Sequence, residues 1–297
     1  MSTGPGADNH LEVLATGPGL TVQDLGREGY GDLGVGRSGA ADGPSLRLAN
    51  RLVGNPEDHA GLEITFGGLR VRFSRTSLVA VTGALGPLTA GGRSEGINTP
   101  ILVRAGEELT VGVPTRGMRS YLAVRGGIAV APVLGSRSTD TLAGLGPDPL
   151  EPGATLPVGE TSLGYPNVDL APRREHPDRP ELRVVPGPRE DWFVAGTLER
   201  LWHEGGYQVS TESNRVGMRL EGPVLEHRGR GELAPEACVA GALQVPPSGR
   251  PILFLADHPV TGGYPVIGVV HPDDLPLAAQ TRPGQFVRFR PDRGKGQ

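Results

Sequence analysis

Two stretches decide the fold class of this chain: Arg-Ala-Gly-Glu-Glu-Leu-Thr-Val at residues 104–111 and Arg-Pro-Gly-Gln-Phe-Val-Arg-Phe at residues 282–289. Each combines a turn, a glycine and then a strand, and the two copies lie at similar places in the two halves. This repetition is compatible with two related β-barrels. Hairpins alone also produce such a pattern, because glycine and proline favour tight turns. Both explanations predict a chain built from short strands.

Strand-like stretches recur along the whole sequence. Each is rich in Val, Leu and Ile and is bounded by Gly, Pro, Asn or Asp. They lie at residues 11–15, 69–73, 77–82, 101–104, 108–113, 119–124, 182–185, 207–210, 239–245, 252–256, 266–270 and 285–289. The 47 glycines and 29 prolines among 297 residues supply the turns between them. We therefore predict a mainly β fold with a barrel or sandwich architecture.

Helix signals are few. Asp42-Gly43-Pro44 is typical of a helix start, and residues 45–53 then place their apolar side chains on one side before Gly54. Residues 192–203 and 273–280 are two further short candidates, the second weakened by Pro276. The fold class is therefore mainly β with a few short helices.

Residues 146–180 are dense in Pro, Gly, Asp and Glu and separate two β-rich halves. We expect a flexible tail at 1–10, a first β-barrel domain at 11–165, a linker at 166–180 and a second β-barrel domain at 181–297. The first ten residues lack the features of a signal peptide, and no apolar run is long enough to span a membrane. We expect a cytoplasmic protein without a membrane partner.

The composition excludes several kinds of chemistry. A formal net charge of −4 creates no field that attracts nucleic acid. The single lysine, Lys295, does not stand inside a phosphate-binding glycine loop, which excludes a P-loop, and a chain without another lysine is a poor candidate for a Schiff base or a Ser–Lys nucleophile. The single cysteine, Cys238, excludes an intrachain disulfide and a cysteine-rich metal site. A reducing compartment agrees with this usage.

Three familiar motifs are absent or lack their context. Residues 34–40, Gly-Val-Gly-Arg-Ser-Gly-Ala, match a dinucleotide fingerprint, but no strand precedes them and Asp42-Gly43-Pro44 delays the helix. The histidines show no metal-ligand spacing, so we predict no metal site. Residues 135–140, Gly-Ser-Arg-Ser-Thr-Asp, are not a nucleophile elbow, and a polar loop explains them equally well.

Two polar clusters carry more information. Residues 210–217, Ser-Thr-Glu-Ser-Asn-Arg-Val-Gly, close a strand and present Arg215, whose planar fork suits carboxylates and phosphates. Residues 244–249, Gln-Val-Pro-Pro-Ser-Gly, precede an apolar strand that ends at Asp257, and Thr-Gly-Gly-Tyr-Pro follows at 261–265. Glycines there let a ligand approach backbone N–H groups. A surface ion pair for Arg215 and a hairpin turn for the glycines are the competing interpretations.

Taken together, these segments resemble one family over nearly the whole chain. In the first half the matching segments are residues 21–27, 38–42, 48–55, 62–64, 82–84, 119–124 and 135–140. In the second half they are Pro-Gly-Pro at 186–188, Ser-Asn-Arg-Val-Gly-Met-Arg-Leu at 213–220, Gln-Val-Pro-Pro at 244–247 and Thr-Gly-Gly-Tyr-Pro at 261–265. The chain is similar to the biotin-dependent carboxyltransferase-like family, which includes KipA-like proteins and the C subunit of 5-oxoprolinase, often labelled allophanate hydrolase subunit 2.

The resemblance implies tandem cyclophilin-like β-barrel units, a complex with a KipI-like B subunit, and a separate A subunit that carries the lactam-handling function. It implies a hydrolase, active only within that complex, that uses ATP to open 5-oxoproline to glutamate. ATP, with its Mg²⁺, would bind at a site shared with the partner subunits, and no biotin would be attached to this chain. Amidase-type allophanate hydrolysis is disfavoured, because it needs a Ser–Ser–Lys set.

The same resemblance suggests the site residues. The catalytic candidates are Arg215, Asp257, Gln244 and Tyr264, and the substrate-binding candidates are Asn214, Gly262, Gly263, Asp42 and Ser38. Arg215 and the backbone amides near Gly262 would hold developing charge. Asp257 or Asp42 would order water or magnesium, while Gln244 and Tyr264 would orient the amide.

Two alternatives stay open. A KipA-like protein would bind and antagonise a KipI-like kinase inhibitor without catalysis. A carboxyltransferase-like module of a biotin-dependent amide carboxylase would act on biotin carried by another protein. Val266 stands where the family commonly has a lysine or arginine, so this departure leaves the exact substrate open.

Overall fold

The computed structural model describes residues 9–292, which form two compact units. The first unit contains the described residues up to Arg27 together with Asp42–Asp140 and Gly144–Glu175. The second contains Glu28–Ala41, Thr141–Ala143 and the described residues from His176 onward. Along the chain, the final boundary between the two units lies at His176, inside the predicted linker 166–180. Two short segments earlier in the sequence, Glu28–Ala41 and Thr141–Ala143, also belong to the second unit. None of the helices within 9–292 is long and apolar enough to cross a membrane.

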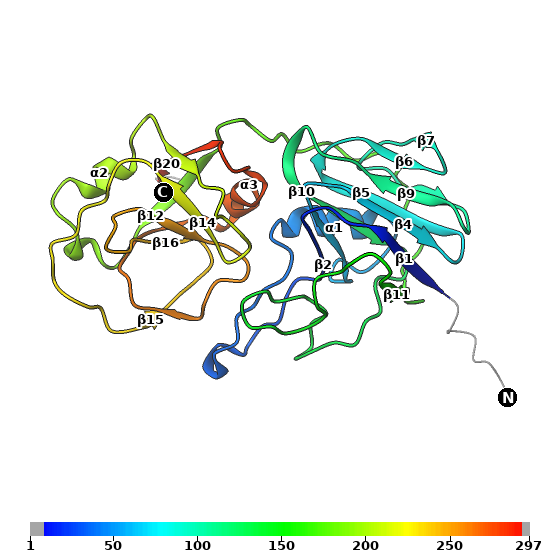
Figure 1. Ribbon diagram of the computed structural model, residues 1–297, viewed down its shortest axis with the longest axis horizontal. Coiled ribbons are helices and arrows are strands. Elements are labelled where there is room, and N and C mark those ends of the chain that lie inside the picture. The colour runs from blue at the N-terminus through cyan, green and yellow to red at the C-terminus, as the bar shows by residue number, and fades with distance from the viewer. Residues whose placement is uncertain (1–8, 293–297) are drawn as a thin grey trace. The chain divides into compact units, whose positions relative to one another are not determined.

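The first unit contains two antiparallel sheets (Figure 1). The strand order of one sheet is β11 (Thr155–Pro157), β1 (His10–Ala15), β4 (Leu69–Phe73), β9 (Glu108–Val111), β6 (Leu88–Ala90) and β7 (Arg93–Ser94). The order of the other is β2 (Gly19–Gln23), β3 (Gly61–Thr65), β10 (Arg116–Val124), β5 (Ser77–Leu85) and β8 (Ile101–Val103). His10, expected in the tail, pairs with Pro157, whereas residues 1–8 of that tail lie outside the described residues.

The core of this unit lies between the two sheets. Alternating apolar residues face it, such as Leu11 and Val13 of β1 opposite Leu62 and Ile64 of β3, and all four are buried. Burial of such a surface is the main driving force for folding. The pattern agrees with the prediction of short strands, arranged here as two packed sheets.

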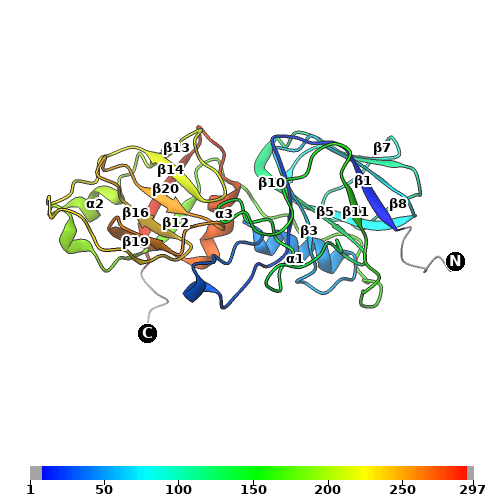
Figure 2. The same ribbon diagram turned by 60° about the horizontal axis from the view of Figure 1, so that its bottom comes forward.

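Helix α1 (Gly43–Leu52) covers the outer face of the second sheet against β5 and β10 (Figure 2). It begins where the sequence predicts, because the Asp42 carboxylate accepts a hydrogen bond from the Ser45 N–H and Pro44 occupies the first turn. Ala49 and Leu52 pack against Ala80 and Ala123 on this face. Strand β10 is therefore buried on both sides.

Tyr121 joins the helix start to the sheet. Because side chains alternate along a strand, Tyr121 shares the α1 side of β10 with Ala123. Its hydroxyl donates to Glu63 Oε2 at 2.8 Å and accepts from the Asp42 N–H at 2.8 Å. Burial, together with the charges of Glu63 and Asp42, raises the pKa of Tyr121 well above its ordinary value, so the hydroxyl keeps its proton.

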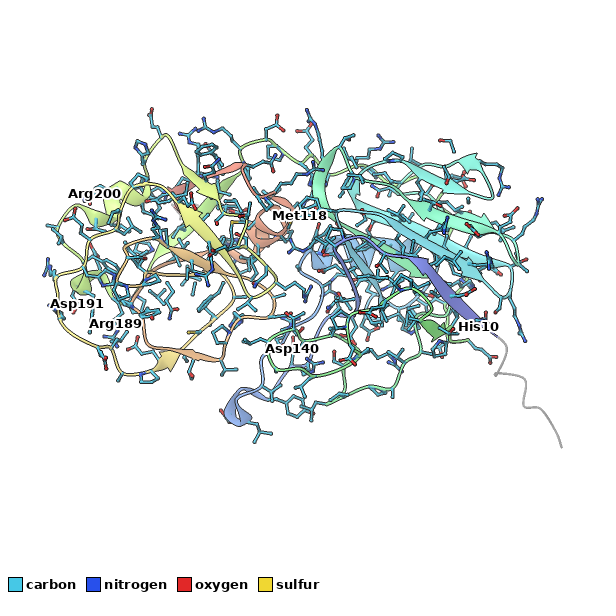
Figure 3. All side chains as sticks on the ribbon, viewed as in Figure 1. His10, Met118, Asp140, Arg189, Asp191 and Arg200 are labelled. Atoms are coloured by element: carbon cyan, nitrogen blue, oxygen red, sulfur yellow. The ribbon has the colours of Figure 1, made fainter. Side chains whose placement is uncertain are left out.

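The second unit is a closed barrel of seven strands, and side chains fill its interior (Figure 3). The strand order is β12 (Glu181–Pro186), β19 (Val266–Val270), β16 (Ala242–Gln244), β17 (Ile252–Phe254), β14 (Gly217–Glu221), β13 (Tyr207–Val209) and β20 (Phe286–Pro291). Closure leaves this sheet without a free edge. A two-stranded ribbon, β15 (Glu236–Ala237) and β18 (Thr261–Gly262), lies outside it.

The predicted mainly β class is confirmed, and the described residues contain three short α-helices. Besides α1 these are α2 (Thr197–Leu201) and α3 (Leu275–Gln280), with 3-10 turns at η1 (Gly31–Leu33), η2 (Glu190–Trp192) and η3 (Pro272–Asp274). The helix expected at 192–203 was too long, because Gly196 has a left-handed φ of 82° and Phe193 forms a β-bridge with His227. The strand expected at 239–245 is shortened by Gly241, whose φ is 90°.

We expect Tyr121→Phe to lower the free energy of unfolding by about 1–3 kcal/mol, because the change removes a buried donor from Glu63 and a buried acceptor from the Asp42 N–H. Urea denaturation of the full chain measures the change. Tyr165→Phe is the matched control, since Tyr165 is 78% exposed and should tolerate the loss of its hydroxyl. Equal stability of both variants would contradict this role for the Tyr121 hydroxyl.

Candidate functional site

The register of two barrel strands places Arg215 beside Asp257. Strands β14 and β17 pair with Gly217 opposite Phe254, and the pairing continues as a hydrogen bond from the Asp257 N–H to the Arg215 carbonyl. Asn214 shapes the turn before β14, because its Oδ1 accepts hydrogen bonds from the N–H groups of Val216 and Gly217. The sequence prediction that joined Arg215 and Asp257 in one site therefore has a simple basis in strand pairing.

The buried Asp257 carboxylate is the centre of a cluster of residues, which we call the Asp257 cluster and which consists of Ser38, Gly39, Thr141, Arg215 and Asp257; all but Thr141 are buried. Arg215 donates from Nε to Oδ2 and from Nη2 to Oδ1, both at 2.9 Å, and also from Nη2 to the Gly39 carbonyl. Ser38 Oγ donates to Oδ1 at 2.7 Å. All members of the cluster belong to the second unit.

Thr141 completes this set and was missed by the sequence analysis. Its N–H and its hydroxyl both donate to Asp257 Oδ2, at 3.0 and 2.7 Å. Thr141 directly follows the segment 135–140 that drew attention as a polar loop, but nothing local to that loop indicates an acceptor 116 residues further along the chain.

The environment of Asp257 favours its ionised form. Burial by itself raises the pKa of Asp257, but the charge of Arg215 and the hydrogen bonds from Arg215, Ser38 and Thr141 outweigh it. The net result is a pKa below the ordinary value of 3.8. The Arg215 guanidinium group, which the sequence analysis expected to bind an anionic ligand, thus binds the Asp257 carboxylate of its own chain.

Ser38 is held in an unusual backbone conformation. Its φ is 54°, in the left-handed region that residues other than glycine rarely adopt, and Gly39 follows with a φ of 93°. The segment 34–40 that matches a dinucleotide fingerprint is preceded by the 3-10 turn η1 rather than by a strand. This agrees with the sequence analysis, which rejected a dinucleotide site here, and Ser38 and Gly39 instead bind Asp257 and Arg215.

Gln244 and Gly262 form a second neighbourhood in the same unit. Gln244 ends β16 and is 5% exposed, and its Nε2 is buried without a hydrogen-bond partner among residues 9–292. A Cβ at Gly262 would overlap this Nε2 and lie 3.0 Å from Cys238 Sγ. Gly262 therefore serves to make room for the Gln244 amide. Neither Gly262 nor Gly263 has a left-handed φ, so backbone freedom is not the reason for glycine at these positions.

The ribbon that carries Gly262 is fixed by charge. Glu236, which pairs with Gly262 across β15 and β18, accepts hydrogen bonds from Arg189. Figure 3 labels Arg189 together with Asp191 and Arg200, and the latter two form exposed ion pairs with Arg230 and Glu226. Tyr264, another candidate of the sequence analysis, follows the ribbon and is 45% exposed.

Asp42 belongs to the first unit, where both of its carboxylate oxygens bind Ser45 and cap α1. Its expected role in ordering water or magnesium has no support in this geometry. Asp257 is also unsuited to a metal, because N–H and O–H donors already occupy both of its oxygens. Within 9–292, no three His, Cys, Asp or Glu side chains come together in a way that could hold a metal ion.

The serine-rich loop at 135–140 serves the first unit. Ser136 and Ser138 both donate from their hydroxyls to Asp24 Oδ1 at 2.6 Å, and the Arg137 N–H donates to Oδ2. Asp140 forms an ion pair with buried Arg27 at 3.5 Å. These serines therefore hold a buried carboxylate, which agrees with the interpretation as a polar loop.

Known proteins resemble this chain over nearly its whole length. A family model described as carboxyltransferase domain, subdomain A and B, matches residues 33–291. The C subunit of 5-oxoprolinase from Escherichia coli strain K12 is 37% identical over 282 residues, which are 94% of this chain and 90% of that protein.

Solved structures show the same fold. The crystal structure of TTHA0988 matches 97% of this chain with a TM-score of 0.87 and 35% identity, and that of K. lactis urea amidolyase matches 95% with a TM-score of 0.87 and 32% identity. The chain spans 57% of the length of the first and 18% of the second.

We expect Asp257→Asn to destabilise the protein at neutral pH by about 3–5 kcal/mol, because it leaves the buried Arg215 without its counter-ion. The pKa of Asp257 is lowered on folding, so its contribution is present above the unfolded value near 3.8 and is lost as the pH falls through the folded value. Denaturation of both proteins between pH 7 and pH 3 should show the difference shrink below about pH 4.

Asp191→Asn is the control for this experiment. Asp191 has an exposed ion pair in the same unit, and its loss should cost under about 1 kcal/mol at any of these pH values. A difference for Asp257→Asn that stays constant from pH 7 to pH 3 would contradict the assignment.

Proposed function

Because the chain belongs to the family of carboxyltransferase domains with subdomains A and B, we propose that it is one component of an ATP-dependent complex that opens 5-oxoproline to glutamate. The observation that carries this proposal is the similarity to the C subunit of 5-oxoprolinase, which extends over 90% of that protein. The similarity to urea amidolyase covers only 17% of its length.

The reaction needs help at the lactam carbonyl. A lactam is stable at neutral pH, and phosphorylation of its oxygen by ATP would make the carbon electrophilic and supply a leaving group. Gln244 is the best-placed residue of this chain to orient the amide, because its buried Nε2 lacks an acceptor within 9–292. Tyr264, with an exposed side chain beside Gly263, would complete that contact.

Arg215 and Asp257 would support the site as a unit. Since Asp257 holds both Nε and Nη2 of Arg215, the pair fixes the loop that carries Ser38 and the turn that carries Asn214. We therefore assign Arg215 and Asp257 to positioning. Electrostatic stabilisation of charge would come from the amides near Gly262 and Gly263.

ATP and its Mg²⁺ would be bound mainly by other subunits. The chain has a single lysine, Lys295, which lies outside the described residues, so a P-loop is excluded by composition. The carboxylates of Asp257 and Asp42 are already hydrogen-bonded, as described above. This distribution supports a complex in which the chain contributes part of a shared site.

The expected partners are a KipI-like B subunit together with a separate A subunit. Large apolar side chains that a monomer would bury are exposed in the first unit between residues 163 and 170: Leu163, Tyr165, Val168 and Leu170. Such a group is typical of a protein–protein contact. We propose this segment as part of the contact with a partner protein of the complex.

One alternative function has an observation in its favour. The family model and the similarity to urea amidolyase fit a carboxyltransferase-like module that acts on biotin carried by another protein. Biotin-dependent carboxylation of urea by a reconstituted complex would favour this alternative over the opening of 5-oxoproline.

We expect the purified chain alone to be inactive on 5-oxoproline, because it lacks a P-loop and a nucleophile elbow. Co-expression with the two candidate partner proteins should yield a complex on gel filtration that releases ADP in proportion to 5-oxoproline. Robust turnover by the chain alone, or elution as a free monomer at micromolar concentration beside both partners, would contradict the proposal.

We expect Gln244→Met to lower turnover of the reconstituted complex about thirtyfold while changing the free energy of unfolding by less than about 1 kcal/mol. The buried Nε2 makes no hydrogen bond that folding would lose, and losing a contact to the reacting amide would cost about 2 kcal/mol. Turnover and urea denaturation are measured side by side. Gln208→Met is the control, since Gln208 of β13 donates its side-chain N–H to the Gly284 carbonyl in the turn before β20. Equal turnover of the two variants would remove Gln244 from the site.

A further inference from the structure

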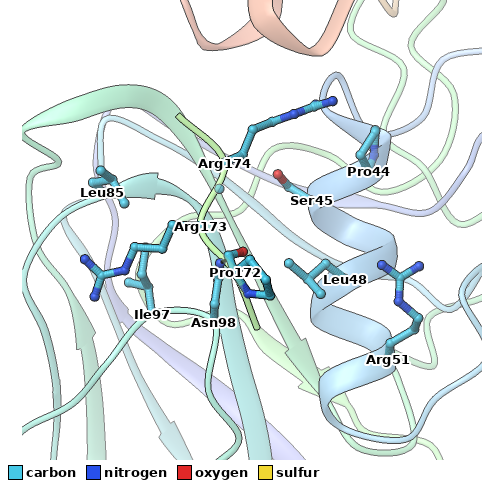
Figure 4. A pocket seen from close by; sticks show the side chains of 11 residues that line it. Pro44, Ser45, Leu48, Arg51, Leu85, Ile97, Asn98, Pro172, Arg173 and Arg174 are labelled. Carbon is cyan, nitrogen blue, oxygen red and sulfur yellow. Dashed lines mark hydrogen bonds between the residues drawn. The ribbon is translucent and has the colours of Figure 1, made fainter. Parts of the chain in front are cut away.

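A cavity of about 220 Å³ lies entirely within the first unit, between α1 and the second sheet (Figure 4). It is lined by Pro44, Ser45, Leu48, Arg51, Gly83, Leu85, Ile97, Asn98, Pro172, Arg173 and Arg174. The candidate site residues of the sequence analysis are absent from this lining, and the proposed function above assigns it no role.

The ionisable side chains that line the cavity are all arginines. Arg51 is paired with Glu57 at 2.7 Å, whereas Arg173 and Arg174 form no ion pair with any other residue in the described part of the chain. Figure 4 shows Arg174 extended towards Pro44 and Arg173 pointing the opposite way, on the side of Leu85 and Ile97. Each guanidinium group is therefore available to an anion on its own side of the cavity, and its planar fork suits a carboxylate.

Asn98 provides a hydrogen-bond acceptor, in contrast to the donors of the arginines. It is 3% exposed, its φ of 62° is left-handed, and its Nδ2 donates to the Pro172 carbonyl at 3.0 Å. Its Oδ1 is buried and accepts no hydrogen bond within residues 9–292. A buried acceptor without a donor is costly, so a ligand N–H at this position would be favoured.

Apolar side chains separate these two polar features. Leu48 of α1 and Ile97 beside Asn98 face the cavity, and Figure 4 shows Leu48 and the Ser45 hydroxyl directed into the same space. The Ser45 hydroxyl donates to Asp42, so towards a ligand it offers only its acceptor lone pairs. The lining thus combines cations, an unsatisfied acceptor and a short apolar wall.

We propose that this cavity binds a small carboxylate that also carries an N–H donor, with the carboxylate held by Arg174, the N–H bound to Asn98 Oδ1 and the carbon skeleton against Leu48 and Ile97. The choice of 5-oxoproline as the probe rests on the proposed function. Binding of a carboxylate with an N–H donor is inferred only from the residues that line the cavity.

The test is titration calorimetry of the full chain with three matched probes. 5-Oxoproline has both groups, 5-oxotetrahydrofuran-2-carboxylate lacks the N–H, and 2-pyrrolidone lacks the carboxylate. We expect 5-oxoproline to bind at least tenfold more tightly than either of the others, which is the size expected for losing one charge-assisted or buried hydrogen bond. No binding of 5-oxoproline, or equal binding of all three probes, would overturn the proposal.

Variants assign the contacts. Arg173→Gln/Arg174→Gln changes two exposed side chains and should weaken 5-oxoproline binding at least tenfold. Asn98→Gly keeps the left-handed backbone and should remove the preference for the N–H over the lactone. Arg75→Gln, an exposed arginine outside the cavity, is the control and should bind as the wild type does. Wild-type affinity in the double variant would overturn the site.

The outcomes separate this site from the proposed function. If the chain binds 5-oxoproline through these residues but the reconstituted complex does not open it, the site stands and the proposed function fails. If the complex opens 5-oxoproline while the double variant and Asn98→Gly bind it as the wild type does, the proposed function stands and the site fails.

Discussion

The buried carboxylate of Asp257 is the constraint on which the second unit depends. An ionised group in a protein interior is tolerated only when its charge and its lone pairs are satisfied. Arg215 supplies the charge and two parallel hydrogen bonds, and Ser38 and Thr141 supply the remaining donors. The strained backbone at Ser38 persists because this arrangement holds it.

The first unit follows the same principle at two other carboxyl groups. Asp24 accepts hydrogen bonds from the hydroxyls of Ser136 and Ser138. Glu63 accepts a hydrogen bond from the Tyr121 hydroxyl and forms an ion pair with Arg119. Several segments that resemble the family, including 21–27, 119–124 and 135–140, therefore have structural roles. The similarity of these segments to the family reflects a shared fold. Evidence for chemistry must come from other polar groups, namely buried ones that have no hydrogen-bond partner within the fold.

Gln244 Nε2 and Asn98 Oδ1 are two such groups, one a donor and one an acceptor. Neither atom has a hydrogen-bond partner among residues 9–292, although both residues are more than nine-tenths buried. Other buried side-chain atoms in the described part of the chain, such as Gln23 Oε1, also lack a partner, but Asn98 lines a cavity and the Gln244 amide lies against Gly262. The proposed contact with a lactam amide and the proposed carboxylate cavity follow from these surroundings together with the unsatisfied atoms.

Much of the fold could be predicted from local patterns. Short apolar runs between turn residues located most strands, and Asp42-Gly43-Pro44 located the start of α1, because both signals act over a few residues. The helix expected from 192 could not be delimited in this way, since the bridge between Phe193 and His227 depends on a distant segment. The proximity of Arg215 and Asp257 could be predicted, because strand register makes them neighbours. Thr141 and the Gly39 carbonyl were missed, because they approach from loops far away in the sequence.

The separation between Ser38 and Asp257 has a consequence for the order of events during synthesis. The two residues are 219 positions apart, and at about 5–20 residues per second a ribosome needs roughly 10–45 s to make the intervening chain. During that time the loop that carries Ser38 exists without the carboxylate that later holds it. The earliest-made part of the second unit thus cannot complete its contact with Asp257 until most of the chain has been synthesised.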